Sequence, residues 1–473
     1  MSRRGCKSRS KSGPKSGRSR EGRILVCAAS ASKLAWAGLI LLATILCQAA
    51  HGADLLQAYR LAQNSDPTFS AARYALESAQ QKIPEARAAL LPTANVTGND
   101  GDTHANTVFT DVTPVDRNMK SWAWTLQLTQ PILRVGSVYA YRESRFVVEQ
   151  AEAQYALAQQ DLILRLAQAY FGVIVAQDAM AEAAAEVQAL EEQLAQVEHG
   201  FALGTHAVTD VDETKARLGL ARSQRIAARN DLQSKGADLE KVTGQPLDQL
   251  AVLSEAVMLP QPNPQDSQVW MDQARANHPS VRAQRAALSA AGEEINKNRS
   301  DHLPTIDLVA SYGSNYASNS LTTPNDYSTR AKSRQVGLQL NVPVFAGGAT
   351  HAKVMEAIAN KDKAQADLAA ASRQAASDAQ QAFVGVNNAQ AQVEALSFAI
   401  ESGQRAVKGN QVGYRLGIRI NLDVLNAQQQ LYAAQRDLSK ARYDGLLQGL
   451  KLKAAAGVLS EQDVLGVNAL LVH

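Results

Sequence analysis

Apolar residues recur at steps of three and four positions along two long stretches of the chain. In residues 137–199 the recurring positions are Ala151, Tyr155, Ala158, Leu162, Leu166, Ala169, Val173, Ala176 and Met180. Towards the C-terminus they are Val424, Ala427, Leu431, Ala434, Leu438 and Ala441. Neither stretch contains proline, and at 1.5 Å per residue the first would form a helix roughly 95 Å long. Such spacing over this length predicts coiled-coil packing, and the many alanines predict closely packed helices.

A second periodicity, of two residues, marks four segments. They cover residues 94–109, 119–131, 305–318 and 333–344. In the second of them Trp122, Trp124, Leu126 and Leu128 alternate with small or polar residues. Alternation over about ten residues predicts β-strands, which either cross a membrane or are half-buried in a soluble sheet. Strand by strand, the pattern does not separate these two possibilities.

The same order of elements occurs twice. Asp66-Pro67, Leu91-Pro92 and Gln130-Pro131 recur 212 positions later as His278-Pro279, Leu303-Pro304 and Val342-Pro343. A constant offset indicates one structural unit used twice. The predicted divisions are a first unit at 54–261, a second at 262–457 and a C-terminal tail at 458–473. Each unit is expected to contain a helix, two strands, a long helix, a tight turn and a shorter helix.

The first helix of each unit is expected to cover residues 55–90 and 269–302, ending before a Leu-Pro pair. Pro84 falls inside the first of these helices and is expected to kink it. The tight turns follow the long helices. They match at an offset of 213 in the pairs Leu203 and Leu416, Gly204 and Gly417, and Asp210 and Asp423. We expect the glycine to end one helix, and the Thr or Asn before each Asp to cap the next.

The charge of the chain is unevenly distributed. Residues 1–53 carry ten Lys or Arg and one acid, so a formal net charge of +3 leaves −6 for the rest. All three cysteines lie in this leader, in which a basic region is followed by an apolar region and then small residues. That order predicts a secretory signal peptide at 1–53, cleaved between Ala49 and Ala53. The alternatives are a membrane anchor and a basic arm for nucleic acid. The acidic body argues against a nucleic-acid surface and offers no thiol chemistry.

No enzyme motif accompanies these patterns. The sequence has no Walker loop, no Gly-x-Ser-x-Gly and no His/Cys metal spacing. We therefore expect no catalytic residues, no metal site, no cofactor and no enzymatic activity.

Four strands per chain cannot close a barrel, and an open sheet edge is not stable in lipid. If the strands cross a membrane, several chains must share the barrel. Three copies would supply twelve strands and a ring of twelve helical rods. The residues alone therefore predict a trimeric tube, but not what it carries. A cytosolic or periplasmic coiled-coil scaffold remains the soluble alternative.

Several segments in order resemble the TolC family of outer-membrane channels over nearly all of the mature sequence. They are Gln130-Pro-Ile, Val342-Pro-Val-Phe-Ala-Gly-Gly, Gly413-Tyr-Arg-Leu-Gly, Leu431-Tyr-Ala-Ala-Gln-Arg-Asp-Leu and Ala456-Gly-Val-Leu. The resemblance implies a mainly α fold with membrane β: a homotrimeric tube with a long periplasmic α-helical barrel and a 12-stranded outer-membrane β-barrel. It also implies three partners: outer-membrane lipid, a periplasmic membrane-fusion adaptor, and an inner-membrane ABC or other efflux transporter.

The resemblance further implies a gate at the helical tip. The family's gate positions fall on Tyr414 and Arg419, and their acceptors fall on Thr209 and Asp210. An arginine fork beside a tight turn suits a charge-assisted bond to Asp210, and an exposed pair, worth about 0–1 kcal/mol, would be releasable. Alternatively, Asp210 and Asp423 are ordinary helix caps and Arg419 is solvated.

Two other sets of positions carry over. The family's first carboxylate ring at the constriction falls on Asp423, but its second falls on Asn426. A single ring of carboxylates should attract cations more weakly than two. The turns expected to dock the adaptor contain Gly200, Leu203, Gly204, Leu416 and Gly417.

The cargo is the least determined feature. The chain also resembles the outer-membrane components that export a large adenylate cyclase–haemolysin toxin, which implies type I secretion of a protein toxin. A multidrug efflux channel is the alternative, and a soluble periplasmic scaffold is more remote. Spacing and composition do not distinguish protein cargo from drugs.

Overall fold

In the computed structural model, the chain that follows the leader forms one compact unit, Gly52–His473. The structure describes residues 53–108, 110, 114–247, 249–254, 259–321, 323 and 327–472. Apart from Ala53, the predicted signal peptide lies outside these residues, as does the predicted strand end at Phe109.

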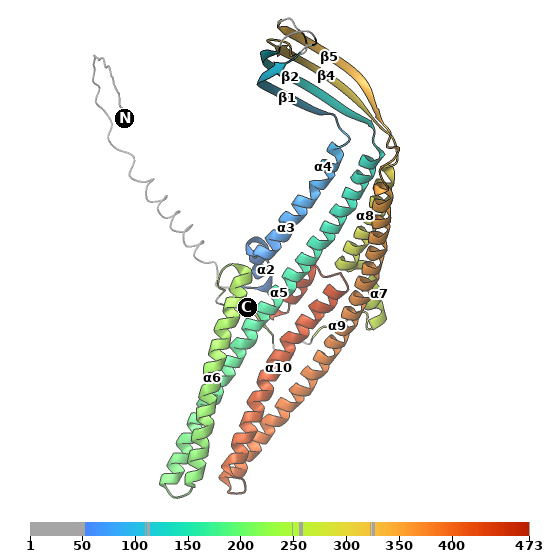
Figure 1. The fold of residues 1–473 in the computed structure, drawn as a ribbon. Coiled ribbons are helices and arrows are strands. Elements are labelled where there is room, and N and C mark those ends of the chain that lie inside the picture. Colours follow the sequence, from blue (N-terminus) through green and yellow to red (C-terminus); the bar gives the residue numbers. More distant parts are fainter. Residues whose placement is uncertain are drawn as a thin grey trace, which may run out of the picture. The chain divides into compact units, whose positions relative to one another are not determined.

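Two similar sets of elements follow one another (Figure 1). The first set is α2 (Leu55–Ser65), α3 (Pro67–Gln80), α4 (Lys82–Ala88), β1 (Thr93–Thr107), β2 (Val115–Leu133), α5 (Val135–Ala202) and α6 (Val208–Thr243). The second is α7 (Ser267–Asn277), α8 (Pro279–Ser300), β4 (Thr305–Ala317), β5 (Thr329–Asn341), α9 (Ala349–Arg415) and α10 (Asn421–Ala455). The tail forms α11 (Glu461–Asn468) and β6 (Leu471–Val472), which pairs with β3 (Val252–Leu253).

The prediction of one continuous first helix in each unit was wrong. The chain leaves helical geometry at Asp66 and at His278, and each is followed by a proline at the first position of the next helix. Proline disfavours helical geometry in the residue before it but suits a helix start. A further break at Gln81 separates α3 from α4, because Pro84 has no N–H to bond the carbonyl of Gln80.

The four predicted strands are present and form one antiparallel sheet in the order β1-β2-β4-β5. Cross-strand partners share a face. One face carries large apolar and aromatic residues: Val96, Trp122, Trp124, Leu126, Leu128, Tyr312, Tyr316, Val336, Leu338 and Leu340. The other face is small or polar, with Thr97, Thr125, Gln127, Ser311, Gly313, Ser333 and Gln335. No other element of the described chain covers the apolar face, and most of its side chains are exposed.

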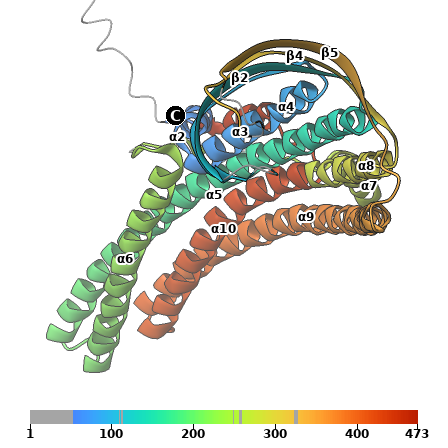
Figure 2. The same ribbon diagram turned by 45° about the horizontal axis from the view of Figure 1, so that its top comes forward.

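The helices form two antiparallel hairpins (Figures 1 and 2). In one, α6 packs against the distal half of α5; in the other, α10 packs against α9. The largest buried cluster joins α2, α5, α6, α10 and α11 around Leu162, Leu166, Tyr170, Ile174 and Leu450. The buried residues of α9 are almost all alanine, as close helix packing requires.

The sheet and the long helices are fixed to each other by polar contacts between the two halves. Arg134, which precedes α5, donates to both carboxylate oxygens of Asp307 on β4, at 3.1 and 2.8 Å. Lys297 of α8 lies 2.6 Å from Glu143 of α5. The Asp307 carboxylate is mostly buried, so this forked pair sets the position of strand β4 on the start of α5.

Candidate functional site

Each long helix ends in the same turn, at the end of the hairpins distant from the sheet (Figure 1). Gly204 and Gly417 both have φ of +73°, the left-handed region that glycine favours. The amide of Thr205 donates to the carbonyl of Gly200, and that of Ile418 to Gly413, both at 2.9 Å. This is the six-residue closure of a Schellman motif, and it confirms the predicted role of the two glycines.

The predicted helix caps were wrong. Helix α6 begins after Ala207 and α10 begins after Ile420, so neither Thr209 nor Asn421 is a cap. Asp210 and Asp423 instead lie in the first turn of their helices. Carboxylates are favourable there because the first amides of a helix carry partial positive charge.

The two turns contact each other through aromatic rings. The His206 ring lies over Gly200, where an added Cβ would come within 2.5 Å of it. The same ring meets Tyr414 of α9 edge to face, with centroids 5.6 Å apart. The Tyr414 hydroxyl is buried and has no hydrogen-bond partner in the described chain. Burial, assisted by nearby Asp210, raises the pKa of Tyr414.

The other predicted gate residues do not pair as expected within one chain. Arg419 Nη1 lies 3.5 Å from Asp423 Oδ2, in its own turn. Within the described residues, the side chain of Asp210 forms no ion pair and accepts only from the amide of Ala207. Thr209 is exposed, and its side chain makes no hydrogen bond to any residue that the structure describes. A bond from Arg419 to Asp210 therefore remains a prediction about neighbouring chains.

A buried polar cluster next to the turns connects three helices. Gln193 of α5 donates to Asn421 of α10 at 2.9 Å, and Asn421 donates to Thr214 of α6 at 3.0 Å. Thr214 donates to the carbonyl of Asp210 at 2.7 Å. The three side chains are between 0% and 9% exposed. Sequence reasoning missed the cluster because Gln193 and Asn421 are 228 positions apart and lie in no shared motif.

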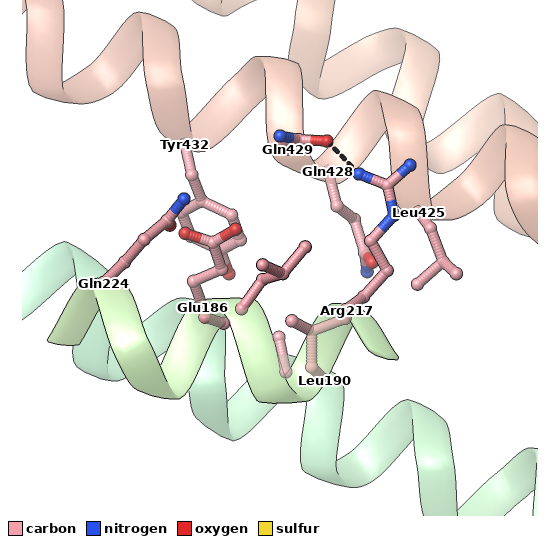
Figure 3. A pocket seen from close by; sticks show the side chains of 11 residues that line it. Glu186, Leu190, Arg217, Gln224, Leu425, Gln428, Gln429 and Tyr432 are labelled. Atoms are coloured by element: carbon pink, nitrogen blue, oxygen red, sulfur yellow. Dashed lines mark hydrogen bonds between the residues drawn. The ribbon is translucent and has the colours of Figure 1, made fainter. Parts of the chain in front are cut away.

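The next layer away from the turns contains a pocket between α5, α6 and α10 (Figure 3). Arg217 of α6 donates to Gln429 and, at 2.9 Å, to Asn426 of α10. Leu190 and Leu425 form part of its apolar wall. The Asn426 amide, predicted to stand in the constriction ring, is thus bonded to Arg217 in this chain.

Three carboxylates on successive turns of α5 lie near α10, starting with Glu186 in the wall of this pocket. Asp178 accepts from Ser439, and Glu186 lies 3.2 Å from Arg436. Glu182 lies between them, and one of its oxygens is buried without a hydrogen-bond partner in the described chain. Burial raises the pKa of Glu182 to about 7; Arg436 opposes the shift, and Asp178 and Asp437 add to it. Within the described residues, no group of three or more His, Cys, Asp or Glu side chains is placed to hold a metal ion.

The outer surface of the turns is apolar. Gly200 is buried, so it shapes the turn and offers no docking surface. Exposed apolar side chains around it are Phe201, Leu203, Val208, Leu416, Ile418 and Ile420. Adjacent exposed apolar side chains on a protein surface are typical of a partner-binding site.

Comparison with known proteins identifies the architecture. The family model described as "Outer membrane efflux protein" matches residues 58–245 and 270–458. The alkaline protease secretion protein AprF of Pseudomonas aeruginosa is 32% identical over 425 residues, covering 89% of this chain and 88% of the relative. Outer membrane protein TolC of Vibrio cholerae is 31% identical over 417 residues, covering 88% and 93%.

Solved structures agree on the fold. The chain matches the Vibrio cholerae outer membrane protein VceC with a TM-score of 0.71 at 18% identity, over 85% of this chain and 96% of that one. It matches the Campylobacter jejuni CmeC outer membrane channel with a TM-score of 0.72 at 18% identity, over 88% and 89%. The predicted combination of a helical barrel segment with membrane strands is confirmed.

Proposed function

The chain belongs to the outer membrane efflux protein family, and from that membership we propose that it is the exit duct of a type I secretion system. Proteins of this family are outer-membrane channels with periplasmic extensions, and this chain is one of them. In the proposed system an inner-membrane ABC transporter and a periplasmic adaptor deliver a folded or unfolded protein, such as a toxin, to the channel.

One observation supports protein cargo. AprF and the proteases secretion protein PrtF of Dickeya chrysanthemi are 32% and 31% identical over 89% of this chain, and both are named for protease secretion. Protein CyaE of Bordetella pertussis is 24% identical over 69% of the chain, so the likeness to a toxin exporter is the weaker support. Multidrug efflux is the second candidate, because the family description itself names efflux.

We propose that three copies form the channel. Within the described chain β1 and β5 are unpaired edges, and the apolar face of the sheet is uncovered. In a bilayer every backbone N–H and C=O must be bonded, so the edges must meet another chain. Pairing of β5 with β1 of the next copy, repeated three times, gives a closed barrel of twelve strands with the apolar face towards lipid.

The gate is proposed at the turns. Tyr414, Arg419, Thr209 and Asp210 lie at the end of the hairpins where three copies would converge, and Asp423 would form the constriction ring. Arg419 would exchange its weak contact with Asp423 for Thr209 and Asp210 of a neighbouring copy. The exposed apolar residues of the turns, including Leu203 and Leu416, would contact the adaptor.

Two measurements test this proposal. The gene is expressed in cells that lack their own exit channel but contain a protease-secreting ABC transporter and adaptor, and secreted protease and drug resistance are measured together. Restored secretion supports the proposed cargo; restored drug resistance alone assigns the channel to efflux. In planar bilayers, Arg419→Ala with Tyr414→Phe should raise a small wild-type conductance. An unchanged conductance would mean that these residues do not form the gate. If no channel forms, the chain is not an exit duct.

A further inference from the structure

The apolar face of the sheet ends in a basic patch on β5. Arg330, Lys332 and Arg334 alternate along the strand, so all three side chains lie on the same face as Val336 and Leu338. All three are exposed. They lie near the start of β5, in the half of the sheet distant from the helices.

Aromatic rings on neighbouring strands hold the two guanidinium groups. Arg330 lies 5.8 Å from the ring centroids of both Trp122 and Tyr316, which are themselves stacked at 6.1 Å. Arg334 lies 5.4 Å from the ring of Tyr312. When a guanidinium lies over an aromatic ring, its N–H groups stay in the guanidinium plane and point outward past the edge of the ring. The side chains therefore point back across β4, away from the unpaired edge of β5.

No carboxylate of the described residues pairs with the basic patch. Among the described residues, none of the three basic side chains has an ion-pair partner. The described acids on the same face are Asp100 and Asp102 of β1, with β2 and β4 between, and Asp116 of β2, which lies six residues along the strand from Trp122 and accepts a hydrogen bond from Asn106. At about 4.8 Å per strand, Asp100 and Asp102 of β1 are separated from β5 by roughly 14 Å.

Three basic side chains with no ion-pair partner among the described residues favour an anion on this lipid-facing surface. At the middle of a bilayer each would be unfavourable by about 2–4 kcal/mol, and near the interface by about 0–1. Trp and Tyr mark that interface in membrane barrels. Because the helices are periplasmic, the far end of the sheet lies at the outer leaflet.

We propose that Arg330, Lys332 and Arg334 bind the phosphate groups of a phosphorylated glycolipid in the outer leaflet of the outer membrane. Arg330 and Arg334 supply forked donors for phosphate oxygens, and Lys332 lies between them as a point charge. Trp122 and Tyr316 contact the adjoining sugar and acyl chains. The inference rests on the barrel proposed above, because only there does this face meet lipid.

The test uses the full trimer in nanodiscs of phosphatidylethanolamine with diphosphorylated lipid A. Native mass spectrometry counts the lipid A molecules that each trimer retains after delipidation. Replacing all three residues (Arg330→Gln, Lys332→Gln, Arg334→Gln) should lower retention about tenfold, as loss of charge-assisted bonds implies. The control on α9 (Lys361→Gln, Lys363→Gln, Arg373→Gln) makes the same charge change and should retain lipid like the wild type. Lys332→Gln alone is the milder variant, with a smaller loss expected.

Other results would overturn the proposal in distinguishable ways. Equal retention of lipid A from which both phosphates have been removed would mean that acyl chains alone are bound. Displacement of lipid A by millimolar inorganic phosphate would make the patch a site for free anions. Unchanged retention with a lower melting temperature of the trimer would mean that the bases pair with Asp100 or Asp102 of the next copy. Conductance measured on the same samples shows separately whether the channel itself forms.

Discussion

Removing the amide of Asn421 tests whether the buried polar cluster holds the two hairpins of a chain together. In Asn421→Ala, Gln193 loses the acceptor 2.9 Å away and Thr214 loses a donor at 3.0 Å, both in buried surroundings. An unsatisfied buried polar group costs about 1–3 kcal/mol. Taking about 2 kcal/mol, and a factor of ten for each 1.4 kcal/mol, the undocked state of the α9–α10 hairpin should become roughly 30-fold more populated.

Single-channel recording in planar bilayers measures this effect directly. We expect more frequent and longer excursions to higher conductance in Asn421→Ala than in the wild type. Hydrogen exchange should increase in the first turns of α10. Gln374→Ala is the matched control, because Gln374 makes a similar bond to Asp378 on an exposed helix face and its loss should change little.

A variant in which all three side chains are apolar separates lost hydrogen bonds from lost packing. Gln193→Leu with Asn421→Leu and Thr214→Val replaces all three polar groups by apolar groups of similar size, which should be nearly neutral for stability. If Asn421→Ala has the same single-channel conductance and the same hydrogen-exchange rates as the wild type, the cluster does not hold the hairpins together. If the triple variant opens as far as Asn421→Ala, lost packing and not an unpaired amide is the cause.

Three further predictions concern other parts of the chain. Burial raises the pKa of Glu182 to about 7 from an ordinary 4.5, so the folded state binds this proton more tightly than the unfolded state. The free energy of unfolding should therefore fall as pH rises from about 4.5 to about 7. In thermal unfolding curves, Glu182→Gln should lack that fall. Gly417→Ala should destabilise the turn by about 1–2 kcal/mol through its positive φ, whereas Gly409→Ala, in open space on a helix, should stabilise by about 0.5–1 kcal/mol in chemical denaturation. Arg134→Gln should lower the melting temperature, because the mostly buried Asp307 carboxylate loses its charged donor; with Arg134 itself 42% exposed, the cost is about 1–3 kcal/mol. Equal stability of Arg134→Gln and the wild type would refute the role of that pair.

The repeated order of elements could be predicted from local patterns. Alternation at Trp122, Trp124 and Leu126 defined a strand because successive side chains on a strand point to opposite faces. The long helices followed from apolar spacing and the absence of proline. Gly204 and Gly417 marked the turns because few other residues adopt positive φ there.

Local chemistry misled where two rules competed. Thr209 is a good helix cap, yet the Schellman turn that closes at Gly204 ends the previous helix early enough for α6 to begin at Val208. The residue that caps a helix depends on where the preceding turn ends. Backbone hydrogen bonds of the turn set that position, whatever the capping preference of the residue itself. The break at Gln81, by contrast, follows from the residue itself: Pro84 was expected to interrupt this helix, and α3 and α4 are separate helices.

The sequence by itself determined which segments are helical, which are strands, where the chain reverses and to which family it belongs. All of these depend on neighbours within a few turns or on matches along the chain. Only the tertiary structure decided that Gln193 donates to Asn421, that Arg134 forms an ion pair with Asp307, and that Arg330 lies over Trp122. Each of these contacts joins residues more than 170 positions apart. Their meeting depends on the packing angle and register of whole elements, which no local pattern encodes.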